Sequence, residues 1–346
     1  MQKEDEDRFL ASYEKLKTHK DIFYVYFSKG LLYFALESVR RVPGDVNLVI
    51  IVAGVDQDEK DIIEKYIERE VIYLKNVYPD MSIWEMLFRY NKYSFGWLDV
   101  DCFVFDSSLF KDLSNLNDGV GVNTVWAGRF SRYQIEDWLA NTFFAFYSKR
   151  AMNEIFDKYG FISPRIARFP EKDLNYLDKE CYTDITEEQI ELLKDKFPLY
   201  KENERGYFDT THLYQIYILM SDMKIGRVRN VDSLKEYYFN GALHLGGCNR
   251  IHVYRLDNPR TNMVFKFNMK FSYLLLKKYL QILPEYYREI YKVFTKTLKD
   301  NGICTDVENL KSSISRYMKR NKLDFEKLNF EEIKPDECRS DKVVTK

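Results

Sequence analysis

Apolar runs alternate with amphipathic segments along the first hundred residues. The runs Ile22 to Phe27, Val46 to Ala53 and Val71 to Leu74 have the length and the β-branched or aromatic content of buried strands. Helical periodicity comes after them in three segments, one ending near Arg41, one from Asp56 to Glu70 and one from Ser82 to Tyr90. This alternation predicts an α/β fold with a mostly parallel sheet, whose ligands bind beyond the carboxyl ends of the strands.

The pattern is less regular in the second half. Strands are predicted at Val120 to Val125 and Asn141 to Tyr147. The segment 161–204 is interpreted as an insertion that shapes a pocket. Helices are predicted at Lys149 to Tyr159, near Glu187 to Lys196, from Thr210 to Met220, and in a C-terminal group at Tyr273 to Leu283, Glu285 to Leu298 and Val307 to Arg320.

The run from Trp97 to Phe105 is typical of a buried strand and carries Asp99 and Asp101. Alternation along a strand places both carboxylates on one face, where they repel each other unless a cation lies between them. Mg²⁺ or Mn²⁺ prefers such oxygen ligands together with phosphate oxygens. The alternative is that both aspartates end the strand and cap the next segment of the chain.

A second acidic pair, Asp56 and Asp58, has the same spacing but comes after a strand and opens a helix. Its carboxylates suit an N-cap and the positive end of the helix dipole, so no metal is needed there.

A glycine-rich segment near residue 245 carries the second chemical signal. His244 can ligate a metal, Gly247 lets the backbone approach a ligand closely, and Arg250 can hold phosphate. An ordinary turn that contains a histidine is the alternative.

Composition limits the remaining possibilities. Lys and Arg number 53 against 54 Asp and Glu, so no overall positive field attracts nucleic acid. The N-terminus is acidic and no run is long and apolar enough for a membrane span, which predicts a cytoplasmic protein. The five cysteines have no paired spacing and are interpreted as free thiols.

These residues resemble the metal-dependent GT-A glycosyltransferases, in particular the family 8-like branch with glycogenin and the bacterial lipopolysaccharide galactosyltransferases. The matching motifs are Leu-Asp-x-Asp-x-x-Val at 98–104 and His-x-x-Gly-x-x-Arg at 244–250, where the branch has lysine in place of Arg250. Asn141 and Asp209 stand in the family's order between the motifs. The chain departs from the family pattern in three places. It lacks the glycine that follows soon after the asparagine at the position of Asn141, the Pro-Trp after the last motif, and an acidic residue beside Asp209.

The resemblance implies a GT-A fold, a nucleotide-sugar donor, most often a UDP-sugar, and a glycan or glycoconjugate acceptor, with Mn²⁺ or Mg²⁺ on the diphosphate. It implies that Asp101 and His244 are ligands of the metal and that Asp99 contacts either the metal or the ribose. It also implies that Arg250, near Gly247, binds a phosphate oxygen of the donor. Phe27, Ser28 and Lys29, at the end of the first strand, are expected to contact the nucleoside. For Lys29 the alternative is a solvated cation in a loop. Asp209 and Asn141 become the catalytic candidates, with retention at the anomeric carbon favoured over inversion. A plain N-cap also explains Asp209.

The implied organisation has a leading helix at 1–20, a nucleotide-sugar-binding half at 21–115, an acceptor half at 116–258 and a helical extension at 259–346. Two other functions stay open. Nucleotidyl transfer also uses paired carboxylates with Mg²⁺, although the chain contains no Gly-Ser dipeptide. A non-catalytic module could dock a partner or attach to a membrane surface through the C-terminal helices, where Phe271, Tyr273, Leu274 and Leu275 lie among lysines. A bundle packed on the core is the alternative for those helices.

Overall fold

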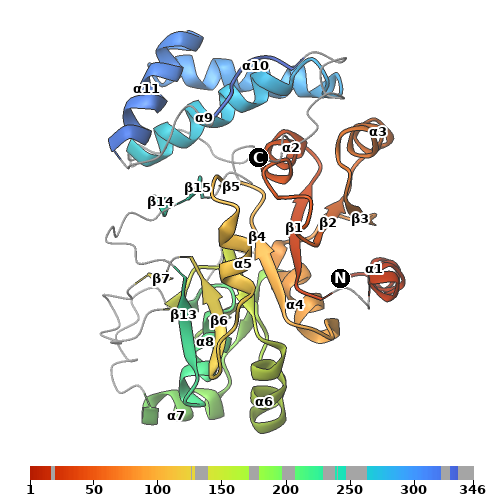
Figure 1. Ribbon diagram of the computed structural model, residues 1–346, viewed down its shortest axis with the longest axis vertical. Helices are drawn as coiled ribbons and strands as arrows, with labels where there is room; N and C mark the ends of the chain where they lie inside the picture. Colours follow the sequence, from red (N-terminus) through yellow and green to blue (C-terminus); the bar gives the residue numbers. More distant parts are fainter. Residues whose placement is uncertain are drawn as a thin grey trace.

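The computed structural model describes residues 1–16, 20–125, 127–128, 139–170, 179–196, 207–228, 238–239, 241–246, 263–320 and 328–333. Within these ranges the chain forms an α/β domain followed by a group of helices that we call the extension (Figure 1).

The first part of the domain contains α1 (Lys3–Leu16), β1 (Ile22–Ser28), α2 (Leu32–Val39), β2 (Leu48–Ala53), α3 (Gln57–Tyr66), β3 (Glu70–Leu74), α4 (Asp80–Tyr90), β4 (Phe95–Leu98), β5 (Cys102–Val104) and α5 (Ser108–Ser114). The second part contains β6 (Val120–Thr124), β7 (Ala127–Gly128), β8 (Leu139–Ala140), β9 (Phe144–Tyr147), α6 (Lys149–Tyr159), β10 (Ile166–Arg168), the 3-10 helix η1 (Lys179–Cys181), β11 (Tyr182–Asp184), α7 (Glu187–Lys196), β12 (Tyr207–Phe208), α8 (His212–Met220), β13 (Lys224–Arg227), β14 (Tyr238–Phe239) and β15 (Ala242–His244). The extension consists of α9 (Met263–Tyr279), α10 (Tyr286–Asp300) and α11 (Val307–Arg320).

The central sheet has seven strands in the order β13-β6-β9-β4-β1-β2-β3. β1 pairs in parallel with β2 and β4, β2 with β3, and β13 with β6, whereas β9 runs antiparallel to β4 and β6. The predicted mixed α/β fold with a mostly parallel sheet is therefore confirmed.

Each face of the sheet has its own hydrophobic core, because side chains alternate along the strands. Phe23, Val25 and Phe27 of β1 pack with α2, α5 and the extension, whereas Ile22 and Tyr24 pack with α1, α4, α6 and α8. Burying each such side chain stabilises the fold by about 1.5–3 kcal/mol.

The middle of the sheet depends on a glycine. Gly96 of β4 pairs with Phe23 of β1, and a Cβ at residue 96 would lie 2.1 Å from Cδ1 of Phe23. Only glycine at residue 96 leaves room for the phenyl ring of Phe23 on the neighbouring strand.

The second acidic pair has the predicted structural role. Asp56 is the N-cap of α3, and its Oδ1 accepts a hydrogen bond from the backbone N–H of Glu59 at 3.1 Å.

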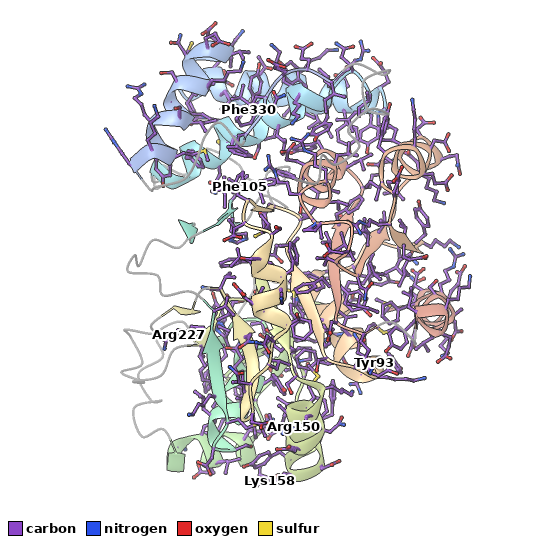
Figure 2. All side chains as sticks on the ribbon, in the orientation of Figure 1. Tyr93, Phe105, Arg150, Lys158, Arg227 and Phe330 are labelled. Atoms are coloured by element: carbon purple, nitrogen blue, oxygen red, sulfur yellow. The ribbon has the colours of Figure 1, made fainter. Side chains whose placement is uncertain are left out.

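The extension differs from the prediction in its extent and in what it covers. α9 begins at Met263, ten residues before the predicted start. The first-half pattern predicted that α2 is amphipathic, with one exposed face, but all eight of its residues are buried. The extension packs against the face that was expected to be exposed. Phe330 lies among the extension helices, with its ring 5.3 Å from that of Phe271 (Figure 2).

The residues suggested for membrane attachment are not available to a membrane. Phe271, Tyr273, Leu274 and Leu275 are at most 3% exposed, as a bundle packed on the core requires. No helix in the described ranges is long and apolar enough to span a bilayer. The three cysteines within those ranges, Cys102, Cys181 and Cys304, are free thiols as predicted.

Candidate functional site

The two aspartates of the predicted metal site lie in a turn and not on one continuous strand. β4 ends at Leu98, the backbone N–H of Asp99 donates to the Phe143 carbonyl at 2.8 Å, and the N–H of Cys102 donates back to the Asp99 carbonyl at 2.9 Å. The predicted strand from Trp97 to Phe105 was wrong in this respect. The chain turns at residues 99–101 and continues as β5, which belongs to a different sheet.

β5 brings the histidine to the aspartates. It pairs antiparallel with β15, which places His244 opposite Cys102, and the N–H of Leu245 donates to the Asp101 carbonyl at 3.1 Å. This pairing brings residues from two distant parts of the sequence to the carboxyl end of β4.

Asp99, Asp101 and His244 form a compact cluster. Nε2 of His244 lies 3.4 Å from Oδ2 of Asp99 and 3.3 Å from Oδ1 of Asp101, and the three ligand atoms lie within 4.8 Å of one another. Ligands around an ion at about 2.0–2.1 Å are separated by roughly 3–4 Å. Two carboxylate oxygens and one imidazole nitrogen therefore have the chemistry and the spacing to hold Mg²⁺ or Mn²⁺.

The charge distribution in the cluster agrees with a cation site. The side chain of Asp101 is 2% exposed, that of His244 12% and that of Asp99 30%. Burial alone would lower the pKa of His244, but the two carboxylates outweigh it and raise the pKa to about 9. Without an ion, the imidazolium thus supplies the positive charge that the carboxylates require. A metal ion would take over that role and release the proton from Nε2, because only neutral imidazole is a ligand.

Two aromatic residues that the sequence patterns did not single out hold the cluster in place. The indole N–H of Trp97 donates to Oδ1 of Asp99 at 2.6 Å, which leaves Oδ2 facing the histidine. Phe143 stacks on the imidazole with ring centres 4.1 Å apart. Nδ1 of His244 is buried and has no hydrogen-bond partner among the described residues.

Asn141 lies just before Phe143, in the segment between β8 and β9. Its Nδ2 is buried and has no hydrogen-bond partner in the described ranges. Gln215 of α8 holds the preceding residue, because its side chain accepts from the Ala140 N–H at 2.7 Å and donates to the Ala140 carbonyl at 3.0 Å. The predicted strand at residues 141–147 begins only at Phe144.

Asp209 is exposed and lies outside the cluster. Its Oδ1 accepts from the Thr210 N–H at 2.8 Å. The plain N-cap interpretation is wrong, since α8 begins at His212 and its N-cap is Thr211. Thr211 is buried with φ 62°, a strained conformation for a β-branched residue, and its Oγ1 lies 2.9 Å from the Tyr147 hydroxyl.

The residues predicted to contact the nucleoside end β1. Phe27 is 1% exposed and packs in the core, which leaves only its backbone atoms for such a contact. Ser28 is partly buried and pairs with Ala53 of β2. Lys29 is an exposed cation in a turn, as its alternative interpretation expected, and its Nζ forms an ion pair with Oδ2 of Asp56 at 2.7 Å. The remaining predicted residues, Gly247 and Arg250, lie outside the described residues.

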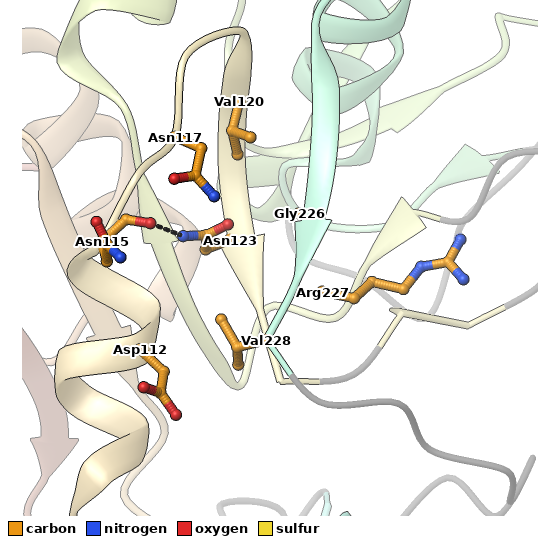
Figure 3. A pocket seen from close by; sticks show the side chains of 8 residues that line it. All are labelled: Asp112, Asn115, Asn117, Val120, Asn123, Gly226, Arg227 and Val228. Carbon is orange, nitrogen blue, oxygen red and sulfur yellow. Dashed lines mark hydrogen bonds between the residues drawn. The ribbon is translucent and has the colours of Figure 1, made fainter.

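A separate polar pocket of about 450 Å³ lies between α5, β6 and β13 (Figure 3). Asn123, one of its lining residues, donates through Nδ2 to the Leu113 carbonyl at 2.8 Å and to the Asn115 carbonyl at 3.1 Å. None of Asp99, Asp101 and His244 lines this pocket.

Two sequence comparisons bear on function. Residues 1–152 match the family model of the StrH glycosyltransferase N-terminal domain. A dTDP-dihydrostreptose–streptidine-6-phosphate dihydrostreptosyltransferase from Streptomyces griseus is 30% identical over 103 residues, which cover 29% of this chain and 27% of that protein. The match thus spans about a quarter of the relative's length. Together these findings support a glycosyltransferase.

Similar solved structures include the glycosyltransferase GlyE of Streptococcus pneumoniae, with 12% identity, coverage of 59% of this chain and 61% of that chain, and a TM-score of 0.30. Mouse xyloside xylosyltransferase 1 has 12% identity, coverage of 59% and 82%, and a TM-score of 0.30. A cytidylyltransferase from Leptospira borgpetersenii has 14% identity, coverage of 62% and 100%, and a TM-score of 0.27.

Proposed function

We propose that this protein is a metal-dependent GT-A glycosyltransferase that moves a sugar from a nucleoside diphosphate sugar to a saccharide, lipid-linked or protein acceptor. The convergence of Asp99, Asp101 and His244 at the carboxyl end of β4 carries the proposal. Ligands of open α/β sheets bind at that edge. The match of residues 1–152 to a glycosyltransferase domain supports sugar transfer as the reaction.

Asp101, His244 and the free oxygen of Asp99 are the proposed ligands of Mn²⁺ or Mg²⁺. When bound, the ion stabilises the negative charge that develops on the diphosphate as the bond to the anomeric carbon breaks. Trp97 and Phe143 fix the orientation of a carboxylate and of the imidazole, as partners of metal ligands commonly do. Arg250, beside Gly247, is the proposed phosphate contact.

The donor is proposed to be a pyrimidine nucleoside diphosphate sugar. The GT-A resemblance favours a UDP-sugar. The name of the Streptomyces relative states a dTDP-sugar, which makes dTDP the second candidate. The nucleoside is proposed to lie at the end of β1, against the backbone of Phe27, against Ser28 and near Lys29.

Two residues are proposed to act on the sugar and the acceptor. The buried, unpartnered Nδ2 of Asn141 supports a hydrogen bond from this amide to a bound sugar. Asp209, exposed to solvent ahead of α8, is proposed to orient the acceptor hydroxyl, with retention at the anomeric carbon. NMR of the product's anomeric proton distinguishes retention from inversion.

Calorimetric titration with UDP and dTDP, in the presence of Mn²⁺ or of a chelator, tests the proposal. We expect tight binding only with the ion, because the two carboxylates repel a diphosphate that arrives without it. Equal affinity in both conditions would assign Asp99 and Asp101 a purely structural role.

Variants locate the ion. Asp101→Asn is expected to abolish Mn²⁺ binding and sugar transfer while the protein stays folded, and His244→Ala to weaken Mn²⁺ binding by a smaller factor. Asp58→Asn is the matched control, since Asp58 belongs to the other Asp-x-Asp pair at the start of α3. Loss of Mn²⁺ binding in Asp58→Asn, or its retention in Asp101→Asn, would place the ion elsewhere.

A further inference from the structure

Asn268 of α9 reaches from the extension to the chain directly after the proposed metal ligand His244. Its side-chain Nδ2 donates to the carbonyls of Leu245 and Gly246, the latter at 3.3 Å. Both partners are carbonyl oxygens, so only the amide nitrogen can satisfy them. Asn268 is 5% exposed.

The surroundings of Asn268 make an amide there costly. Its neighbours Phe267, Met269 and Phe271 are all buried in the hydrophobic core, and Oδ1 of Asn268 has no hydrogen-bond partner among the described residues. A buried acceptor without a partner is destabilising, and leucine would fill a similar volume without that cost. Asn268 therefore provides hydrogen bonds to Leu245 and Gly246 at a cost in stability that an apolar side chain would not have.

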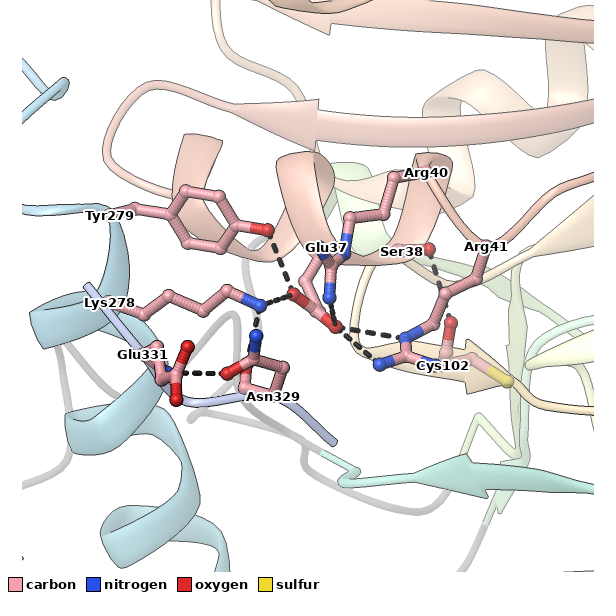
Figure 4. A network of polar contacts seen from close by, with 9 residues as sticks. All are labelled: Glu37, Ser38, Arg40, Arg41, Cys102, Lys278, Tyr279, Asn329 and Glu331. Atoms are coloured by element: carbon pink, nitrogen blue, oxygen red, sulfur yellow. Dashed lines mark hydrogen bonds and ion pairs between the residues drawn. The ribbon is translucent and has the colours of Figure 1, made fainter. Parts of the chain in front are cut away.

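The other end of α9 is anchored beside β5. Lys278 and Tyr279 donate to Oε2 of the buried Glu37 on α2, at 2.9 and 2.8 Å. The next residue of α2, Ser38, donates through Oγ to the Cys102 carbonyl at 3.1 Å (Figure 4). α9 is thus connected to both sides of the β5–β15 pair, to the residues directly after β15 through Asn268 and to β5 through Glu37 and Ser38.

We propose that Asn268 is a positioning residue for the metal site, through which the extension holds residues 245–246 and thereby directs the imidazole of His244 at Asp99 and Asp101. This inference rests on the proposed function, because it assigns the extension a part in ion binding. The extension then completes the site instead of only covering the domain.

The test compares Asn268→Leu and Asn268→Asp with the wild type. Asn268→Leu removes the donor and keeps the volume, whereas Asn268→Asp puts a carboxylate against two carbonyls. Lys270→Met is the matched control, since it removes a hydrogen bond of the same helix, from Nζ to Ser313 Oγ on α11 at 2.9 Å. Calorimetry measures Mn²⁺ affinity, denaturation measures stability, and ¹⁵N NMR of the four histidines tracks the His244 ring.

We expect both Asn268 variants to bind Mn²⁺ about tenfold more weakly, the effect typical of losing a residue that orients a metal ligand. The His244 ring signal should shift even without metal, and Lys270→Met should match the wild type in both measurements. If Asn268→Asp fails to fold, Asn268→Leu decides.

Wild-type Mn²⁺ affinity together with an unchanged His244 signal in Asn268→Leu would overturn the inference. A wild-type protein that binds no Mn²⁺ would overturn the proposed function, and the metal-free His244 signal would still test the positioning role separately.

Discussion

Removing the buried Glu37 should destabilise the protein far more than removing its partner Lys278. One carboxylate faces three cations here: Arg40 at 2.9 Å, Arg41 at 2.6 Å and Lys278 at 2.9 Å. Glu37 and Lys278 are 2% and 1% exposed, and Arg40 is 38% exposed, so solvent screens mainly the Arg40 pair.

The surroundings favour the charge on Glu37 but oppose the charge on Lys278, as the pKa shifts of the two groups indicate. Burial would raise the pKa of Glu37, but Arg40, Arg41 and Lys278 together lower it from 4.5 to about 2. For Lys278, burial together with repulsion from the two arginines outweighs the attraction of the single carboxylate and lowers the pKa from 10.5 to about 8. The first shift favours the charged form of Glu37, whereas the second opposes the charged form of Lys278.

Glu37→Gln is therefore expected to lower the free energy of unfolding by about 3–5 kcal/mol, since it leaves cations buried without a counterion. Lys278→Met should cost less than about 1 kcal/mol, because the loss of its hydrogen bonds is offset by the removal of an unfavourable buried charge. Glu289→Gln is the control, as Glu289 is 71% exposed and should change stability by less than about 0.5 kcal/mol.

Guanidinium denaturation at pH 7 measures these differences. Far-UV circular dichroism includes the extension, whereas every tryptophan of the sequence lies at or before residue 138 and thus outside the extension. An equal loss of stability in Glu37→Gln and Lys278→Met would refute the reasoning that the carboxylate is shared among three cations.

Four further outcomes are expected from the structure. Because the folded-state pKa of Glu37 is depressed, its contribution to stability is complete above pH 4.5 and is lost as the pH falls to about 2; acid titration of Glu37→Gln should lack this part of the wild-type decline. Trp97→Phe should keep the ring packing but weaken Mn²⁺ binding about tenfold in calorimetry, because the indole N–H is lost. Gly96→Ala should lower the free energy of unfolding by about 1–3 kcal/mol, since the new Cβ overlaps Phe23; thermal denaturation checks it. Asp209→Asn should chiefly raise the acceptor KM in steady-state assays, and a collapsed kcat with an inverted product would instead make Asp209 the base.

Elements with a strong local pattern were predictable from the sequence. α6 and α7 have the predicted bounds, and β1 and β2 lie within two residues of theirs, because the periodicity of a helix or a buried strand is contained in its own residues. The burial of α2 on every side was not predictable, because the covering surface comes from the extension, far along the chain.

The Asp99–Asp101–His244 cluster was predictable in its members but not in its construction. Asp99, Asp101 and His244 converge as the two motifs indicated. The break between β4 and β5 was missed because the run is apolar on both sides of the aspartates and the break depends on pairing with β15. Trp97 and Asn268 belong to no recognisable motif. In the sequence they stand out only as a tryptophan close to an acidic pair and as an asparagine within an apolar helical segment.

The pairing of β5 with β15 also governs when the three side chains of the cluster can come together during synthesis. A ribosome that has made Asp101 needs roughly 7–30 s more to reach His244 at about 5–20 residues per second. Throughout that interval both aspartates exist but the histidine that completes the cluster does not. The proposed ion therefore has its full set of ligands only after the first half of the domain has been made, and a completed cluster marks a chain whose distant segments have already come together.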